Sequence, residues 1–305
     1  KSFLLSNALR EAQKDGAIIL AIDSENALDS DFVSKIGVDP NPPNFNYVSV
    51  VTIPQVTKVI SSFLDEYRQS YKNDLENAPK VVIAIDSLDM LMTDTEVEHY
   101  SKGNTRGDQG QRNKQLKAML RTLVQDIKEL NVAIACTSQV YVNQDPLNGE
   151  GRWIVSEAVK YSMSIIALLT KLKLRGSGVS KFEGIRLRVN GYKTRFTKPF
   201  QQIEIEVPYE SGMNPYSGVI EVGVELGVLE RAGSRYRFVG EDKTFFAKDF
   251  TDEMGDITLA AIDEILRNNN HLAIEIDTGL EEDGDDEKRS SKKKREEKAR
   301  EVLHG

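Results

Sequence analysis

Cysteine is almost absent from this sequence, and histidine is scarce. Among 305 residues the single cysteine, Cys136, cannot form an internal disulfide, which favours a reducing compartment, and we expect a cytoplasmic protein. No signal peptide opens the chain, and no run of about 18 apolar residues could form a membrane-spanning helix, so no membrane partner is expected. The three histidines, His99, His271 and His304, share no ligand spacing, and no transition-metal site is predicted.

Basic residues are outnumbered by acidic ones. The chain has 40 Lys and Arg against 48 Asp and Glu, a net charge of −8. This balance argues against a protein that holds nucleic acid by a uniformly basic surface, although it leaves room for a local basic groove. The length is sufficient for two domains, or for one large domain with a small appendage.

Buried apolar runs alternate with amphipathic stretches in the first half of the chain. The runs are continuous, as in strands covered on both faces, and the stretches have helical spacing. This alternation predicts βαβ units and an α/β fold with a mostly parallel sheet. The predicted strands are Ala17–Asp23, Tyr47–Thr52, Lys80–Asp86 and Val132–Thr137, and the helices are Phe3–Gln13, Gln55–Tyr71 and Gln111–Leu130.

The pattern changes after residue 162. Strands joined by Gly-rich or charged turns are predicted at Met163–Leu174, Gly184–Asn190 and Gln201–Val207, and this end of the sheet is expected to be antiparallel. A small α+β domain follows, with helices at Val219–Leu229 and Asp249–Asn268 and a strand at Tyr236–Val239. The last residues form a block of acids and then a basic stretch, which is typical of a solvated, disordered tail. We therefore expect an α/β core over 1–215, a C-terminal domain over 216–280 and a charged tail over 281–305.

Polar residues stand where the predicted parallel strands end, which is where such sheets bind ligands. The strand that ends at Asp86 has the Walker B pattern, in which a carboxylate holds Mg²⁺ through water. Taken alone, Asp86 could equally be a capping residue that starts a turn. Lys1-Ser2, at the start of a helix, match the last two letters of the P-loop. Lys1 would neutralise nucleotide phosphates and Ser2 would ligate Mg²⁺, and we expect upstream residues to supply the phosphate-binding glycines, which would make this chain a fragment.

Several motifs follow one another along the chain in a specific order and spacing. They are Asp23–Asp29 (DSENALD), Gly37–Asp39 (GVD), Val81–Ser87 (VVIAIDS), Gln139, Tyr192–Arg195 (YKTR) with Pro199-Phe200, and Tyr209–Gly218 (YESGMNPYSG). In this order they resemble bacterial RecA and its phage counterpart UvsX. The resemblance extends from Lys1 to about Gly240, and the phage type is the preferred version.

The resemblance implies roles around a bound ATP. Glu25 would orient the attacking water, although an isolated glutamate there could simply favour a helix N-terminus. Asp29 and Phe32 fall where the family contacts adenine, and Tyr209 would close the base pocket, although Phe32 could be a core residue. These positions imply ATP and Mg²⁺ as cofactors.

The same resemblance implies residues that sense or complete the site. Gln139 would sense the γ-phosphate, and the alternative is a strand-end glutamine bonded to backbone. Lys193 and Arg195, on one face of an extended segment, would act across a subunit interface like an arginine finger. Without the family resemblance, Lys193 and Arg195 would be interpreted as solvated surface charges.

Two Gly-rich polar stretches, 98–113 and 140–156, are predicted to be loops. They correspond to the family's two DNA-binding loops. Cations in them could meet phosphates, and Tyr141 or Trp153 could insert between bases, although Trp153 could also be buried. The candidate DNA-binding residues are Lys102, Arg106, Arg112, Arg152 and Trp153.

The function that the resemblance implies is DNA-dependent ATP hydrolysis by a nucleotide-dependent, homo-oligomeric filament on single-stranded DNA. Such a filament pairs with homologous double-stranded DNA and exchanges strands in recombination and repair, and single-strand-binding and mediator proteins are further candidate partners. A DnaB-like ring helicase with the same core is one alternative. A recombinase paralogue that binds DNA without useful hydrolysis is another.

Overall fold

The computed structural model describes residues 1–41, 43–104, 110–143, 153–175, 182–195, 202–209 and 212–276. The side chains of 153, 175, 182 and 269–276 are outside this description. The chain divides into two units, Lys1–Ser164 and Ile165–Gly305. The predicted boundary between a core domain and a C-terminal domain at residue 215 stays a prediction. The predicted tail, 281–305, lies outside the described residues. None of the described helices combines the length and apolar character needed to cross a bilayer.

A four-stranded parallel sheet forms the centre of the first unit. Its strands are β1 (Ile18–Asp23), β2 (Phe45–Ser49), β3 (Val81–Asp86) and β4 (Val132–Cys136), in the order β2-β1-β3-β4. The apolar runs of β1 and β3 are almost entirely buried, as expected for strands covered on both faces. The predicted α/β fold with a parallel sheet is confirmed.

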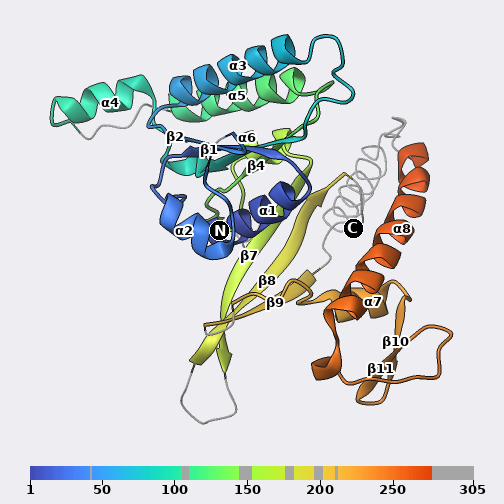
Figure 1. Cartoon of the computed structure of the whole chain (residues 1–305). Helices are drawn as coiled ribbons and strands as arrows, with labels where there is room; N and C mark the ends of the chain where they lie inside the picture. Colours follow the sequence, from blue (N-terminus) through green and yellow to red (C-terminus); the bar gives the residue numbers. More distant parts are fainter. Residues whose placement is uncertain are drawn as a thin grey trace, which may run out of the picture. The chain divides into compact units, whose positions relative to one another are not determined.

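Helices cover both faces of this sheet (Figure 1). Helices α3 (Ile53–Ser70) and α5 (Gln111–Asp126) lie over one face, and α1 (Ser2–Lys14) and α2 (Ser30–Ile36) lie over the other. Leu5 and Leu9 of α1 pack with Ile19 of β1 in one buried cluster. Helix α3 begins at a capping box between Thr52 and Gln55, which satisfies backbone donors of its first turn.

Short elements occupy parts of the stretches that were predicted to be loops. Helix α4 (Asp94–Ser101) begins at a capping box formed by Thr93 and Glu96, and α5 begins at Gln111, so the loop prediction for 98–113 is wrong at both ends. In 140–156, strands β5 (Tyr141–Val142) and β6 (Trp153–Ile154) pair antiparallel. The turn η1 (Leu88–Met90) and helix α6 (Glu157–Ser162) complete the unit.

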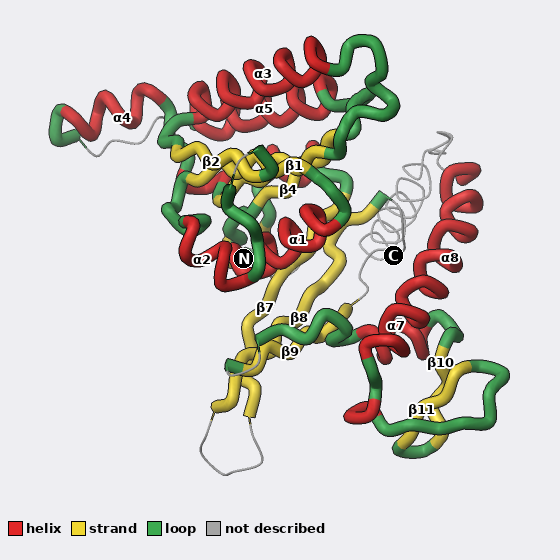
Figure 2. The backbone as a smooth tube through the Cα atoms, viewed as in Figure 1, coloured by secondary structure: helices red, strands yellow, loops and turns green. Residues whose placement is uncertain are grey.

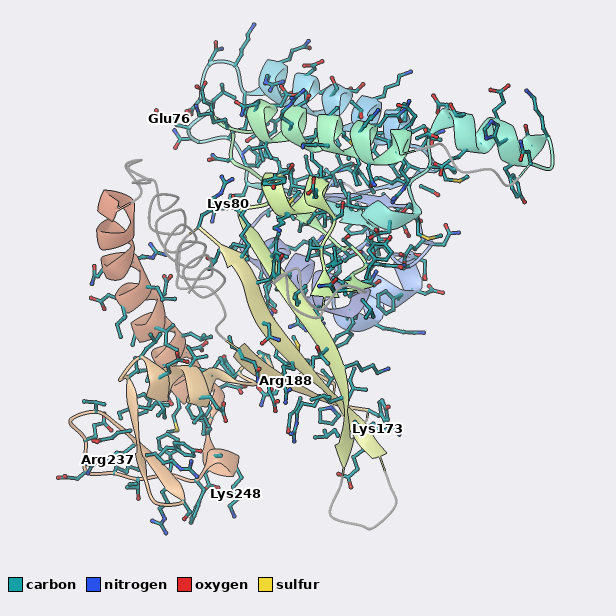
Figure 3. The ribbon with its side chains drawn as sticks, turned by 180° about the vertical axis from the view of Figure 1, so that it is seen from behind. Glu76, Lys80, Lys173, Arg188, Arg237 and Lys248 are labelled. Carbon is teal, nitrogen blue, oxygen red and sulfur yellow. The ribbon has the colours of Figure 1, made fainter. Side chains whose placement is uncertain are left out.

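The second unit contains a three-stranded antiparallel sheet. Its strands are β7 (Ile165–Arg175), β8 (Phe182–Thr194) and β9 (Gln202–Pro208). The antiparallel pairing was predicted for this region, but the strands form a separate sheet and not the end of the parallel one. On one face Arg188, labelled in Figure 3, forms an ion pair with Glu204 at 2.9 Å. Gly184 is required where β8 meets β9, because a Cβ atom there would lie 2.4 Å from the Val207 carbonyl oxygen.

The rest of this unit is a small α+β group (Figure 2). Helix α7 (Val219–Glu225) is followed by the hairpin of β10 (Leu229–Ala232) and β11 (Arg235–Phe238), then by η2 (Ala247–Asp249) and α8 (Asp252–Ile276). The predicted helix from Val219 to Leu229 ends four residues early. Gly227 has a φ of +74°, which favours a turn, and Leu229 begins β10 instead.

Candidate functional site

The tips of β1 and β3 are joined by hydrogen bonds. Asp23 and Asp86 end these strands in register, and each is followed by a serine. The amide of Ser24 donates to the Asp86 carbonyl at 2.8 Å, and the Ser24 hydroxyl donates to the Ser87 carbonyl at 2.7 Å. The Ser87 amide donates back to the Ser24 hydroxyl at 2.9 Å. The two strand ends therefore form one rigid edge that carries Glu25 on one side and Asp86 on the other.

Asp23 organises the loop that contains Glu25. Its carboxylate is fully buried and accepts hydrogen bonds from the amides of Glu25 (3.0 Å), Ala27 (3.2 Å) and Leu28 (2.9 Å). The hydroxyl of Tyr47 on β2 donates to it at 3.1 Å. Burial, and secondarily the Asp23 carboxylate, raises the pKa of Tyr47 to about 12. The loop conformation thus depends on a buried acid whose two oxygens both accept hydrogen bonds from the protein.

Glu25 is half-buried at this edge. Its carboxylate accepts a hydrogen bond from the hydroxyl of Ser87, whose residue is fully buried at the tip of β3. This bond brings the Glu25 carboxylate to the residue that follows Asp86. The two predicted site acids, Glu25 and Asp86, are therefore held on adjacent strand tips, as a water-orienting group and a metal-holding group require.

Asp86 has one satisfied and one unsatisfied oxygen. The residue is fully buried, its Oδ1 accepts a hydrogen bond from the Thr137 hydroxyl, and its Oδ2 is buried with no hydrogen-bond partner among the described residues. A buried polar atom without a partner is costly and calls for a ligand, an ion or water. Carboxylate oxygens are what Mg²⁺ and its bound waters prefer. The donor set at this strand tip therefore fits a hydrated Mg²⁺.

The N-terminus of α1 has the character of an anion site. Lys1 occupies the N-cap position and Ser2 is the first helical residue, and no side chain caps the first turn. Backbone N–H groups and the helix dipole favour negative charge there. Leu5 and Leu9 pack α1 against β1 and so fix the position of the helix. Its first turn, which favours negative charge, fits the role of a phosphate-binding segment.

Gln139 follows the β4 strand, and its backbone N–H group is held by Asp89. Asp89 lies in η1, directly after the β3 tip, and its carboxylate accepts the hydrogen bond from the Gln139 amide. The Gln139 residue itself is exposed. Its backbone is thus tied to the segment that carries Asp86, while its role as a phosphate sensor stays a prediction.

Comparison with known proteins assigns the chain to a family. The model of the RecA N-terminal domain matches residues 1–214. This chain belongs to the RecA family. A protein named Protein RecA from Nocardioides sp. is 26% identical over 253 residues, which cover 79% of this chain and 64% of the relative. Its namesake from Chlorobium chlorochromatii is 26% identical over 250 residues, covering 78% of this chain and 63% of the relative.

A longer match covers most of this RecA-family chain. The Protein RecA of Paracoccus denitrificans is 24% identical over 302 residues, which cover 93% of this chain and 75% of the relative. The chain spans just under two thirds of the length of the Nocardioides and Chlorobium relatives.

Two candidate DNA-binding cations of this RecA-family chain, Arg112 and Lys102, have partners within the protein. The Arg112 guanidinium donates to the carbonyls of Leu91 (2.7 Å) and Leu88 (2.9 Å), and so fastens α5 to the η1 segment. Lys102 forms an ion pair with Glu98 at 2.5 Å, and both side chains are largely exposed. Direct DNA contact by these two cations stays a prediction.

Three further DNA-binding candidates are less fully described. Arg106 and Arg152 lie outside the described residues. The backbone of Trp153 lies in β6, and its side chain is outside the description. On the neighbouring strand, Tyr141 has 53% of its surface exposed, so an aromatic side chain is accessible at the base of the second predicted loop.

Two of the three predicted adenine-contacting residues, Asp29 and Phe32, have structural roles. The Asp29 side chain caps α2 by accepting from the Phe32 amide at 3.0 Å, and Phe32 packs against the core cluster between α1 and β1. In the second unit, Tyr209 follows β9 and is 68% exposed. Adenine contact by these three residues stays a prediction.

The two predicted trans-acting cations belong to the second unit. Lys193 lies near the end of β8, and Arg195 follows the strand. Burial, together with the nearby Arg195 charge, lowers the pKa of Lys193. This shows that the two cations are close to one another, as expected for residues two apart on an extended strand.

Sequence reasoning did not assign roles to four residues that shape the site, namely Asp23, Tyr47, Ser87 and Thr137. The sequence contained a signal for two of them, Asp23 and Ser87. Both strand tips read Ala-Ile-Asp-Ser, at Ala21–Ser24 and Ala84–Ser87, and adjacent parallel strands with the same ending place two acids and two serines at one edge.

Proposed function

We propose that this RecA-family chain is a DNA-dependent ATP hydrolase that forms filaments on single-stranded DNA and exchanges strands with homologous double-stranded DNA. The phage-type, UvsX-like version is the preferred subtype. One observation carries the catalytic part of the proposal. At the strand tip next to Glu25, Asp86 presents a buried oxygen that has no hydrogen-bond partner among the described residues, in a chain whose first 214 residues match the RecA N-terminal domain.

The first unit would divide the chemistry among a few residues. Lys1 and the first turn of α1 would hold the nucleotide phosphates, while the Ser2 hydroxyl and Asp86 would hold Mg²⁺. The bound metal would neutralise charge on the phosphate oxygens. Glu25 would orient the attacking water, because phosphoryl transfer depends on positioning and charge stabilisation more than on a strong base.

Other residues would couple this site to the nucleotide base, DNA and neighbouring subunits. Asp29, Phe32 and Tyr209 would contact adenine. Gln139 would report the terminal phosphate to the β5–β6 segment, which begins two residues after it. Its backbone is also tied to Asp89, close to the strand tip that carries Asp86. Lys193 and Arg195 would complete the site of a neighbouring subunit, which makes hydrolysis depend on assembly.

DNA would be held by the segments 98–113 and 140–156. Their proposed contacts are Lys102, Arg106, Arg112, Arg152 and Trp153, with the cations on phosphates and the aromatic side chain on bases. The proposed partners are single-stranded DNA, double-stranded DNA, further copies of the chain, and single-strand-binding and mediator proteins.

The test is ATP turnover by the full-length protein with and without single-stranded DNA, together with nucleotide binding across a Mg²⁺ titration. Turnover should require single-stranded DNA, and Asp86→Asn should weaken Mg²⁺-dependent nucleotide binding because the lost charge faces the metal. Asp15→Asn, at an exposed position after α1, is the matched control and should bind like the parent.

Two results would contradict the proposal. The metal assignment is wrong if nucleotide affinity does not depend on Asp86. Electron microscopy of the protein on DNA addresses the assembly, because filaments that do not unwind duplex DNA support a recombinase, whereas closed rings with unwinding activity support a helicase.

A further inference from the structure

Thr137 lies between the β4 tip and the β3 tip. Its amide donates to the Ile85 carbonyl at 3.0 Å, and its own carbonyl accepts from the Leu88 amide at 3.0 Å. These two bonds fix the Thr137 backbone on both sides of Asp86. The residue is 8% exposed, and its hydroxyl donates to Asp86 Oδ1.

The hydroxyl distinguishes the two oxygens of Asp86. A carboxylate without a fixed donor can turn about its last torsion angle and present either oxygen. Here the Thr137 hydroxyl occupies Oδ1, and the buried Oδ2 has no partner among the described residues. Oδ2 is therefore the oxygen that still needs a polar partner.

A buried threonine hydroxyl suits this task. The β-branched side chain has restricted χ1 freedom, and burial at the strand tip limits it further. The hydroxyl is thus directed at one atom. Groups that hold a metal-binding carboxylate in this way commonly tune metal affinity without touching the metal.

We propose that Thr137 is a positioning residue for Mg²⁺, which holds Asp86 so that Oδ2 faces the metal or its bound water. This inference rests on the proposed function, because it assumes that Asp86 binds Mg²⁺. It adds to that function a residue on a different strand whose hydroxyl sets the orientation of the metal-binding carboxylate.

Three substitutions separate the hydroxyl from the shape of the side chain. Thr137→Val keeps the branched shape and removes the donor, whereas Thr137→Ser keeps the donor and removes a methyl group. Thr258→Val is the matched control, because Thr258 is a fully buried threonine of α8 whose hydroxyl donates to the Met254 carbonyl at 2.7 Å. The control makes the same chemical change in the other unit.

The measurement is binding of a fluorescent ATP analogue to the full-length protein during a Mg²⁺ titration. Thr137→Val should raise the Mg²⁺ concentration at half-saturation by about 10–100-fold, the usual effect of losing a group that holds a metal ligand. Binding without Mg²⁺ should be unchanged. Thr137→Ser and Thr258→Val should resemble the parent. If Thr137→Val does not fold, Thr137→Ala against Thr137→Ser gives the same contrast.

Combination with Asp86→Asn makes the test specific. In that background Thr137→Val should have no further effect on the Mg²⁺ dependence, because the carboxylate that it orients is gone. If the parent responds to Mg²⁺ and Thr137→Val responds equally, the Thr137 inference is wrong and the proposed function stands. If nucleotide binding by the parent ignores Mg²⁺, the metal assignment at Asp86 is wrong and the Thr137 inference fails with it.

Discussion

Replacing Asp23 with asparagine should loosen the Glu25 loop without changing the size of the side chain. In the parent, Oδ1 accepts from the amides of Glu25 and Ala27, and Oδ2 accepts from the Leu28 amide and the Tyr47 hydroxyl. Asparagine retains one carbonyl oxygen, so the amides of Glu25 and Ala27 keep an acceptor. Its NH₂ group then faces the N–H of Leu28, a residue that is fully buried. The Tyr47 hydroxyl can turn and accept instead.

The expected loss of stability follows from these bonds. A buried donor left without an acceptor costs about 1–3 kcal/mol, and the two retained bonds weaken because the acceptor is no longer charged. Relief from burying a charge offsets part of this loss. We expect Asp23→Asn to lower the free energy of unfolding of the first unit by about 2–4 kcal/mol. Asp15→Asn, at an exposed site, should stay within about 0.5 kcal/mol of the parent.

Two measurements test this prediction. Urea unfolding followed by tryptophan fluorescence reports on the first unit, because the only tryptophan, Trp153, belongs to it. Hydrogen exchange at the Leu28 amide should also accelerate in Asp23→Asn. If Asp23→Asn unfolds at the same urea concentration as the parent and protects the Leu28 amide equally, the buried carboxylate does not organise the loop.

Three further predictions concern other residues. Arg112→Ala should destabilise the first unit by about 1–3 kcal/mol in urea, because two carbonyls lose a charged donor; unchanged unfolding would indicate a purely DNA-binding role. The Tyr47 contribution to stability should be complete below pH 10 and lost toward pH 12, where the unfolded phenol ionises first, so Tyr47→Phe should abolish that loss in unfolding measurements. A double variant of Lys193 and Arg195 to alanine, mixed with Glu25→Gln, should regain ATP turnover if the cations act in trans; absence of rescue in mixed filaments would refute this.

The long buried strands could be predicted from the sequence within about two residues. Continuous apolar runs that end in an acid have few structural alternatives in a parallel sheet, and β1 and β3 follow them. The short helices α2 and α4 could not be predicted from the sequence, because neither has a long apolar stripe. Their limits depend on single caps, Asp29 for α2 and Thr93 for α4.

In the candidate site, too, some features could be predicted from the sequence and others could not. The position of Asp86 at a strand tip follows from a local pattern of four apolar residues and an acid, and the placement of Glu25 beside it follows from the motif after β1. The contacts of Thr137 and Ser87 depend on which strands are neighbours, and strand order is a property of the whole sheet. No role was predicted for Asp23, because its inward orientation depends on hydrogen bonds from the amides of Glu25 and Leu28.

The most direct test of the central claim is ATP turnover by Glu25→Gln at saturating single-stranded DNA and Mg²⁺. The amide keeps the size of the side chain and a hydrogen bond to Ser87, but it cannot accept a proton from water. Turnover should therefore fall by about 10²-fold or more, while nucleotide binding persists. Turnover equal to that of the parent would contradict the assignment of this strand-tip edge as the hydrolytic site.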